Sequence, residues 1–143
     1  MRYLLSGSCR CGNIRLDMTL SAEPESYNPR ACDCDFCHEH NIAFLSDPDG
    51  CVVLYTTSLS NLNISRQGDN LAEFISCASC SQILGARRHS FGCVNTRGLF
   101  NDVNFGEELS ISPKQLKSEQ KIARWEALWF PRFTCVIAKM VMN

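Results

Sequence analysis

The residues of this 143-residue chain best suited to chemistry are its cysteines, seven of which fall into three tight groups. A disulfide within so short a segment is strained, because its sulfur atoms must lie about 2.05 Å apart with a defined torsion. A tetrahedral zinc ion, with Zn–S distances of about 2.3 Å, instead holds its sulfur ligands about 4 Å apart, and short C-x-C or C-x-x-C segments (zinc knuckles) supply that spacing. The pattern therefore predicts zinc binding by Cys9 and Cys11; Cys32, Cys34 and Cys37; and Cys77 and Cys80.

Seven thiolates divide naturally into four and three. Two knuckles from distant parts of the chain would make a closed four-cysteine site, which is a structural arrangement, and the site would contribute to the free energy of folding. The triplet Cys32, Cys34 and Cys37 would leave one coordination position open, as catalytic zinc sites do. Spacing alone does not decide which knuckles pair, nor whether a fourth ligand from His38, His40 or Cys51 closes the second site.

The remaining cysteines and several arginines have simpler interpretations. Cys51, Cys93 and Cys135 stand alone, and we expect them to be small core residues. Because zinc bound by three or four thiolates carries net negative charge, nearby guanidinium groups could contact such a site. Solvated surface positions are an equally good interpretation for each of the four arginines near the knuckles in sequence, which are Arg10, Arg30, Arg87 and Arg88.

The elements that would position these cysteines are mostly short strands. Apolar and β-branched runs separated by turn residues predict strands over 3–9, 13–20, 42–46, 52–55, 62–65, 71–76, 82–88 and 92–95. Two prolines in 21–30 indicate a loop, and a short helical turn could begin at Ser112. One helix is predicted over 119–129, with Ser118 as its N-cap and with Ile122, Trp125 and Trp129 forming an apolar face that we expect to lie in the core.

Composition limits the class of protein. With 45% apolar residues, 20% charged residues and a net charge of −1, the chain is expected to fold as a single domain over residues 1–143. The near-zero charge indicates neither nucleic-acid nor membrane attraction. There is no apolar run of membrane-spanning length and no convincing signal peptide, so a cytoplasmic location is the expectation. The sequence also lacks a glycine-rich phosphate loop and the G-x-S-x-G and H-E-x-x-H motifs.

Together, three segments resemble the glutathione-dependent formaldehyde-activating enzyme family, which includes the centromere protein V-like proteins. They are Gly7-Ser8-Cys9-Arg10-Cys11-Gly12-Asn13-Ile14, Cys32-Asp33-Cys34-Asp35-Phe36-Cys37 and Cys77-Ala78-Ser79-Cys80, and the resemblance covers roughly residues 3–100. It implies a mainly β, Mss4-like β-tent of antiparallel sheets with zinc knuckles and a short C-terminal helix. It also implies two zinc ions per chain, a structural one held by Cys9, Cys11, Cys77 and Cys80 and one with an open position held by Cys32, Cys34 and Cys37.

The resemblance further implies a carbon–sulfur lyase or synthase that adds a small thiol such as glutathione to an aldehyde such as formaldehyde. Three thiolates make zinc a poor activator of water, but an incoming thiol would still lose its proton and remain nucleophilic. The alternative hypothesis is a non-catalytic, Mss4-like zinc-binding interaction module, in which the protein's own side chains saturate the metal.

Overall fold

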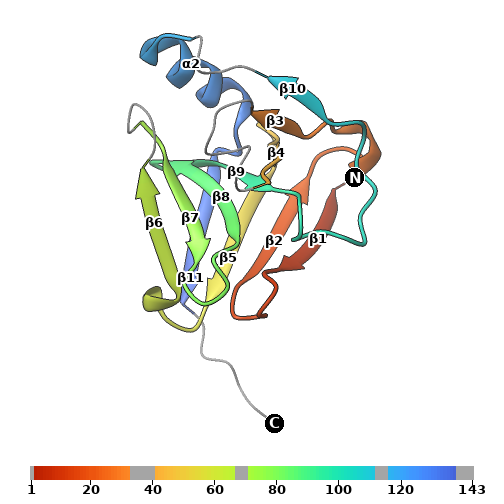
Figure 1. Ribbon diagram of the computed structural model, residues 1–143. Coiled ribbons are helices and arrows are strands. Elements are labelled where there is room, and N and C mark those ends of the chain that lie inside the picture. Colours follow the sequence, from red (N-terminus) through yellow and green to blue (C-terminus); the bar gives the residue numbers. More distant parts are fainter. Residues whose placement is uncertain (1, 33–40, 67–70, 112–115, 138–143) are drawn as a thin grey trace.

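The computed structural model describes residues 2–32, 41–66, 71–111 and 116–137. Within these residues the strands form two sheets (Figure 1). The first sheet has the order β1-β2-β5-β11 and the second the order β10-β3-β4-β9-β8-β7-β6. The first contains β1 (Tyr3–Ser8), β2 (Arg15–Leu20), β5 (Cys51–Thr56) and β11 (Arg132–Ile137). The second contains β3 (Arg30–Cys32), β4 (Phe44–Leu45), β6 (Leu62–Arg66), β7 (Glu73–Cys77), β8 (Ile83–Arg88), β9 (Phe91–Asn95) and β10 (Leu109–Ile111).

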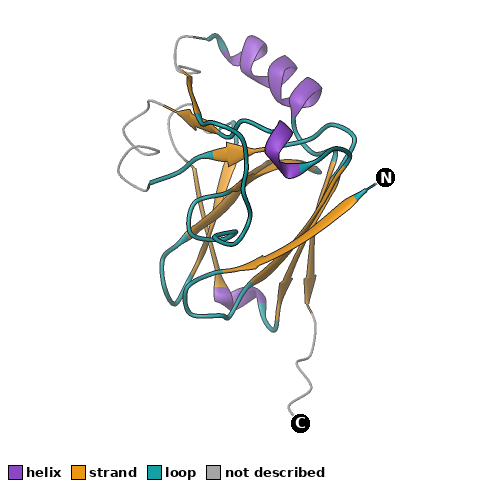
Figure 2. Cartoon of the chain, turned by 90° about the vertical axis from the view of Figure 1, so that its right-hand side faces the viewer, coloured by secondary structure: helices purple, strands orange, loops and turns teal. Residues whose placement is uncertain are grey.

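The helix α2 (Ser118–Leu128) lies at one end of the strands in both views (Figures 1 and 2). Its N-cap is Lys117, one residue before the predicted cap, and it ends before Pro131 as expected. Two 3-10 turns, Pro24–Ser26 and Leu59–Asn61, complete the regular structure of the described residues. In this part of the chain, no helix is long and apolar enough to cross a membrane.

The prediction of a mainly β fold with a helix near the end is confirmed, but the sheets are not purely antiparallel. Strand β11 pairs with β5 in parallel, and β10 pairs with β3 in parallel. Parallel neighbours need a long connection between them, and here each pair is separated by many intervening elements. The short strand β3 begins at Arg30, the last residue of the predicted loop. The helical turn predicted at Ser112 lies outside the described residues.

The main core draws on both sheets. Alternation in β2 and β5 buries Leu16, Met18 and Leu20 together with Val52 and Leu54. These side chains belong to one apolar cluster with residues of the second sheet, which are Ile75, Leu84 and Val94. Each such fully buried side chain stabilises the fold by about 1.5–3 kcal/mol.

Strand β11 joins the two sheets through Phe133, whose side chain is 1% exposed. The Phe133 amide donates to the carbonyl of Ser90, in the turn between β8 and β9. The ring lies so close to β9 that a Cβ built on Gly92 would be 2.5 Å from Phe133 Cδ2. Glycine at this position therefore permits the packing of β11 against the second sheet.

A second apolar cluster lies between α2 and the second sheet. The Trp125 and Trp129 rings stack with centroids 4.8 Å apart, and they pack with the buried Ala86 and Cys93. The predicted apolar face of the helix is thus directed at the protein interior, with Trp129 buried and Trp125 half-buried. Cys93 is fully buried, as predicted, whereas the other two lone cysteines, Cys51 and Cys135, are half-buried in strands.

Candidate metal centre

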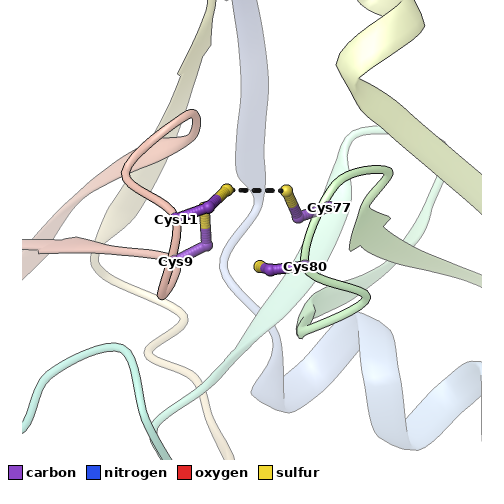
Figure 3. Close-up of side chains that lie close together, drawn as sticks. All are labelled: Cys9, Cys11, Cys77 and Cys80. Atoms are coloured by element: carbon purple, nitrogen blue, oxygen red, sulfur yellow. Dashed lines mark hydrogen bonds between the residues drawn. The ribbon is translucent and has the colours of Figure 1, made fainter.

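The first knuckle is a turn between β1 and β2. The Cys9 amide donates to the Ile14 carbonyl at 3.1 Å, and the Gly12 amide donates back to the Cys9 carbonyl at 3.0 Å. Gly12 has a φ of +80°, which only glycine adopts without strain. This tight reversal places the side chains of Cys9 and Cys11 on the same side of the turn (Figure 3).

The second knuckle is the turn between β7 and β8. The Cys77 amide donates to the Gln82 carbonyl at 3.0 Å, and the Ser81 amide donates to the Cys77 carbonyl at 2.9 Å. Ser81 has a φ of +64°, a left-handed conformation that costs a non-glycine residue free energy. The strained turn aims Cys77 and Cys80 at the first knuckle (Figure 3).

The four sulfur atoms of the two knuckles all lie within 4.8 Å of one another. The Sγ atom of Cys11 lies 3.5 Å from Cys9 Sγ and 3.5 Å from Cys77 Sγ. Tetrahedral zinc with Zn–S bonds of about 2.3 Å requires sulfur separations of about 3.8 Å, so small shifts would suffice. Cys9 and Cys77 are buried, Cys80 is half-buried and Cys11 is exposed, and all four are free thiols. The cluster therefore fits a metal ion, and four soft sulfur ligands suit zinc.

Burial and hydrogen bonding give the thiols of Cys77 and Cys80 very different pKa values. Burial is the main cause that raises the pKa of Cys77 to about 12. Burial also raises the pKa of Cys80, but hydrogen bonds to its sulfur outweigh that effect and lower the pKa to about 6. The donors are the backbone N–H groups of Gln82 and Cys11 and the thiols of Cys77 and Cys11. The cluster thus favours one thiolate at Cys80, and metal ligation requires the thiolate form.

Polar contacts fix the two knuckles against each other. Arg10 Nη2 donates to the Cys80 carbonyl at 2.9 Å, and the Arg10 amide donates to Gln82 Oε1 at 2.9 Å. Asn13 Nδ2 donates to Ser79 Oγ at 3.1 Å. Of these residues, only Arg10 is among those that the sequence marks as possible neighbours of the metal. Gln82, Asn13 and Ser79 have no spacing signal of their own, because their pairing depends on the tertiary meeting of the knuckles.

The structure describes little of the cysteine triplet. Cys32 ends β3, whereas Cys34, Cys37, His38 and His40 lie outside the described residues. Cys51, the third alternative ligand, begins β5 in the first sheet. Whether the triplet forms a second site, open or closed, stays a prediction.

The remaining arginines singled out above lie in different places. Arg30 precedes the triplet, is half-buried and donates from Nη2 to Ser46 Oγ at 2.6 Å. Burial is the main cause that lowers its pKa, with Arg124 acting in the same direction and Cys93 opposing it. Arg87 and Arg88 end β8, whereas Cys80 precedes that strand, so these two arginines lie at the opposite end of β8 from the four cysteines.

Comparison with known proteins shows the fold alone. No protein-family model matches the chain, and no curated protein matches it. The chain is similar to a crystal structure of a Rhodobacter sphaeroides protein, solved as a structural-genomics target, with a TM-score of 0.51 and 22% sequence identity. The match covers 73% of this chain and 100% of that protein. The established class is therefore a mainly β protein with a four-cysteine cluster able to hold a metal ion.

Proposed function

We propose that the chain is a zinc-dependent carbon–sulfur lyase or synthase of the kind that the glutathione-dependent formaldehyde-activating family represents. The observation that carries the proposal is the meeting of Cys9, Cys11, Cys77 and Cys80 within 4.8 Å, which is the grouping that the family resemblance implies. Because these four thiols serve one structural zinc, the three grouped cysteines that remain are available for a second zinc. Three ligands leave that zinc one open position.

In the proposed reaction, Cys32, Cys34 and Cys37 would hold the second zinc, which would act as a Lewis acid toward an incoming small thiol. Bound zinc would lower the pKa of that thiol, so that it binds as a nucleophilic thiolate. The thiolate sulfur forms a bond to the aldehyde carbon while the carbonyl π bond breaks, and the carbonyl oxygen takes up the proton that the thiol released. The product is an S-hydroxyalkyl thiol adduct, and no residue of the chain is consumed.

The position of Arg30 supports an anionic thiol such as glutathione. Arg30 lies two residues before Cys32, and within the described part of the chain it belongs to none of the ion pairs. A half-buried guanidinium group that no described carboxylate pairs with attracts anions more strongly than a fully solvated one. The carboxylates of glutathione would satisfy that charge.

The closed geometry of the described site favours a second candidate function. Four thiolates saturate a tetrahedral zinc, and such a site holds a fold together without performing chemistry. If the triplet is saturated in the same way, the chain is a zinc-stabilised interaction module with no turnover.

Metal counting and an adduct assay separate the two functions. We expect about two zinc ions per chain in the purified protein, and the loss of one from the folded double variant Cys34→Ser/Cys37→Ser. Cys135→Ser, which removes a lone half-buried thiol, is the control and should keep both ions. A single zinc in the unaltered protein contradicts the two-site proposal.

Adduct formation from glutathione and ¹³C-formaldehyde is then followed by NMR. The proposal expects a rate above the spontaneous one, and that excess is lost in the double variant and kept in Cys135→Ser. Arg30→Gln should weaken the use of glutathione more than that of a neutral thiol such as 2-mercaptoethanol. A two-zinc protein with no excess rate identifies the interaction module instead.

A further inference from the structure

A hollow of about 400 Å³ lies at one end of the β7–β8 hairpin, and the four-cysteine site lies at the other. The hairpin turn carries Cys80, whereas the strand ends away from that turn begin at Glu73 and finish at Arg88. The hollow is therefore separate from the candidate metal centre. Its described lining residues are Arg66, Leu71, Glu73, Arg87, Arg88 and His89.

The lining carries an excess of positive charge. Among the described lining residues, three arginines and one glutamate give a net formal charge of +2. Strand register explains why three of these residues lie together, because Arg66 pairs with Glu73 across β6 and β7, and Glu73 pairs with Arg87 across β7 and β8. Residues directly opposite in neighbouring strands present their side chains on the same face. One carboxylate is thus placed between two guanidinium groups and cannot neutralise both.

Contacts among the described residues leave this charge largely uncompensated. Glu73 approaches Arg66 only to 4.0 Å, and both side chains are substantially exposed. A pair of this kind is weak because water and salt screen it. Among the described residues, neither Arg87 nor Arg88 forms an ion pair with a carboxylate.

Backbone carbonyls instead hold the two guanidinium groups. Arg87 Nε donates to the His89 carbonyl at 2.7 Å, and Arg88 Nη1 donates to the Leu71 carbonyl at 3.0 Å. Arg87 Nη1 also makes a longer contact of 3.8 Å to Cys135 Sγ. Each guanidinium has five N–H donors, so several remain for a ligand. Anchored guanidinium groups lose less freedom on binding an anion than free surface arginines do.

The turn between β8 and β9 has an unusual backbone conformation at His89, which places the imidazole of that residue beside the hollow. His89 follows β8 with a φ of +55°, a left-handed conformation that is uncommon outside glycine and in which asparagine, aspartate and histidine are enriched. Hydrogen bonds to the His89 and Ser90 carbonyls, from Arg87 and from Phe133, hold the turn. Backbone strain of this kind is often retained at binding sites. Here it brings an imidazole to the lining of a basic hollow.

We propose that this hollow binds a small organic dianion, such as a phosphate ester or a dicarboxylate, through Arg87 and Arg88 with Arg66 and His89 in support. Two negative charges match the net charge of +2 on the described lining residues, and planar guanidinium forks bind phosphate and carboxylate oxygens in pairs. The volume of the hollow exceeds that of the charged group alone, which leaves room for a short carbon skeleton against Leu71.

Titration of the ¹⁵N-labelled, zinc-loaded full chain at low ionic strength tests this site. Inorganic phosphate and succinate are the two probes, and acetate is the monoanion control. We expect saturable shifts of the His89 and Arg87 signals with at least one dianion, and the tighter of the two identifies the ligand class. Equal responses to acetate, or shifts that never saturate, overturn the proposal.

Two variants with opposite expected effects make the test independent of folding. Arg88→Gln should weaken dianion binding about tenfold or more, because it removes a charge-assisted contact. Glu73→Gln should tighten it several-fold, because it removes the competing carboxylate from the hollow. Arg132→Gln, an exposed position on β11, removes the same charge elsewhere and should change nothing. Weaker binding in Glu73→Gln, or equal losses in Arg88→Gln and Arg132→Gln, refutes the assignment. No thiol or aldehyde is present, so the result does not depend on the proposed enzymatic function.

Discussion

Replacement of Cys11 by serine tests the structural role of the four-cysteine site most directly. Cys11 is exposed, so the substitution removes a metal ligand without opening a cavity in the core. Its sulfur lies 3.5 Å from that of Cys77, which is 66 residues away in the chain. A metal ion that joins the knuckles therefore closes a long loop, and a covalent cross-link of this length restricts the unfolded chain by about 4 kcal/mol.

That amount is a large part of the free energy of unfolding of a typical small domain, which is about 5–15 kcal/mol. With three thiolates left, the Cys11→Ser variant should release its zinc ion at a chelator concentration at which the unaltered protein retains it. The free energy of unfolding in guanidinium should then fall by up to about 4 kcal/mol, together with a loss of one zinc ion measured by elemental analysis.

Cys135→Ser is the matched control, because it removes a half-buried thiol from β11, away from the cluster. It should keep the zinc ion and a guanidinium midpoint close to that of the unaltered protein. If Cys11→Ser keeps the same zinc content and the same midpoint in chelator, the four cysteines do not form the metal site. If zinc is lost without any fall in stability, the cross-link argument is wrong.

Three further predictions concern the scaffold. Gly92→Ala places a Cβ 2.5 Å from Phe133 Cδ2 and should cost about 1–3 kcal/mol in thermal unfolding; an unchanged midpoint would contradict the packing of β11. Ser81→Gly relieves a φ of +64° and should stabilise the protein by about 0.5–1 kcal/mol in guanidinium unfolding, whereas destabilisation would show that the serine side chain matters more than the strain. Burial opposes ionisation of Asp47, but hydrogen bonds led by that from Tyr27 outweigh it and lower its pKa. Its contribution to stability should therefore be complete above about pH 4 and be lost as pH falls through the lowered pKa. In Asp47→Asn this acid-dependent part of the denaturant midpoint should be absent.

Local patterns were sufficient to predict where most of the strands lie. The strands β2, β5, β7, β8 and β9 alternate or run apolar between turn residues, and each was expected within two or three residues of its observed ends. The parallel strand pairs could not be predicted, because no local pattern in β11 indicates that it pairs with β5. The position of β11 depends on tertiary packing as well as on its pairing, because Phe133 needs the space that Gly92 leaves in β9.

The candidate metal site was also only partly predictable from the sequence. Cysteine spacing indicated the knuckles, but only the family resemblance indicated that Cys9 and Cys11 meet Cys77 and Cys80. The supporting contacts of Arg10 with Cys80 and with Gln82 join residues about seventy positions apart, so their geometry exists only in the folded chain. The strain at Ser81 was equally hidden, because a serine carries no sequence signal for a left-handed conformation.

The distance along the chain between the two knuckles also sets an order of events during synthesis. A ribosome adds about 5–20 residues per second, so the 66 residues between Cys11 and Cys77 take about 3–13 seconds to make. During that interval the thiols of Cys9 and Cys11 have no partner knuckle. A metal ion can be captured by all four sulfur atoms only after β7 and its turn have been made, so the time of metal loading marks the time at which the two halves of the fold meet.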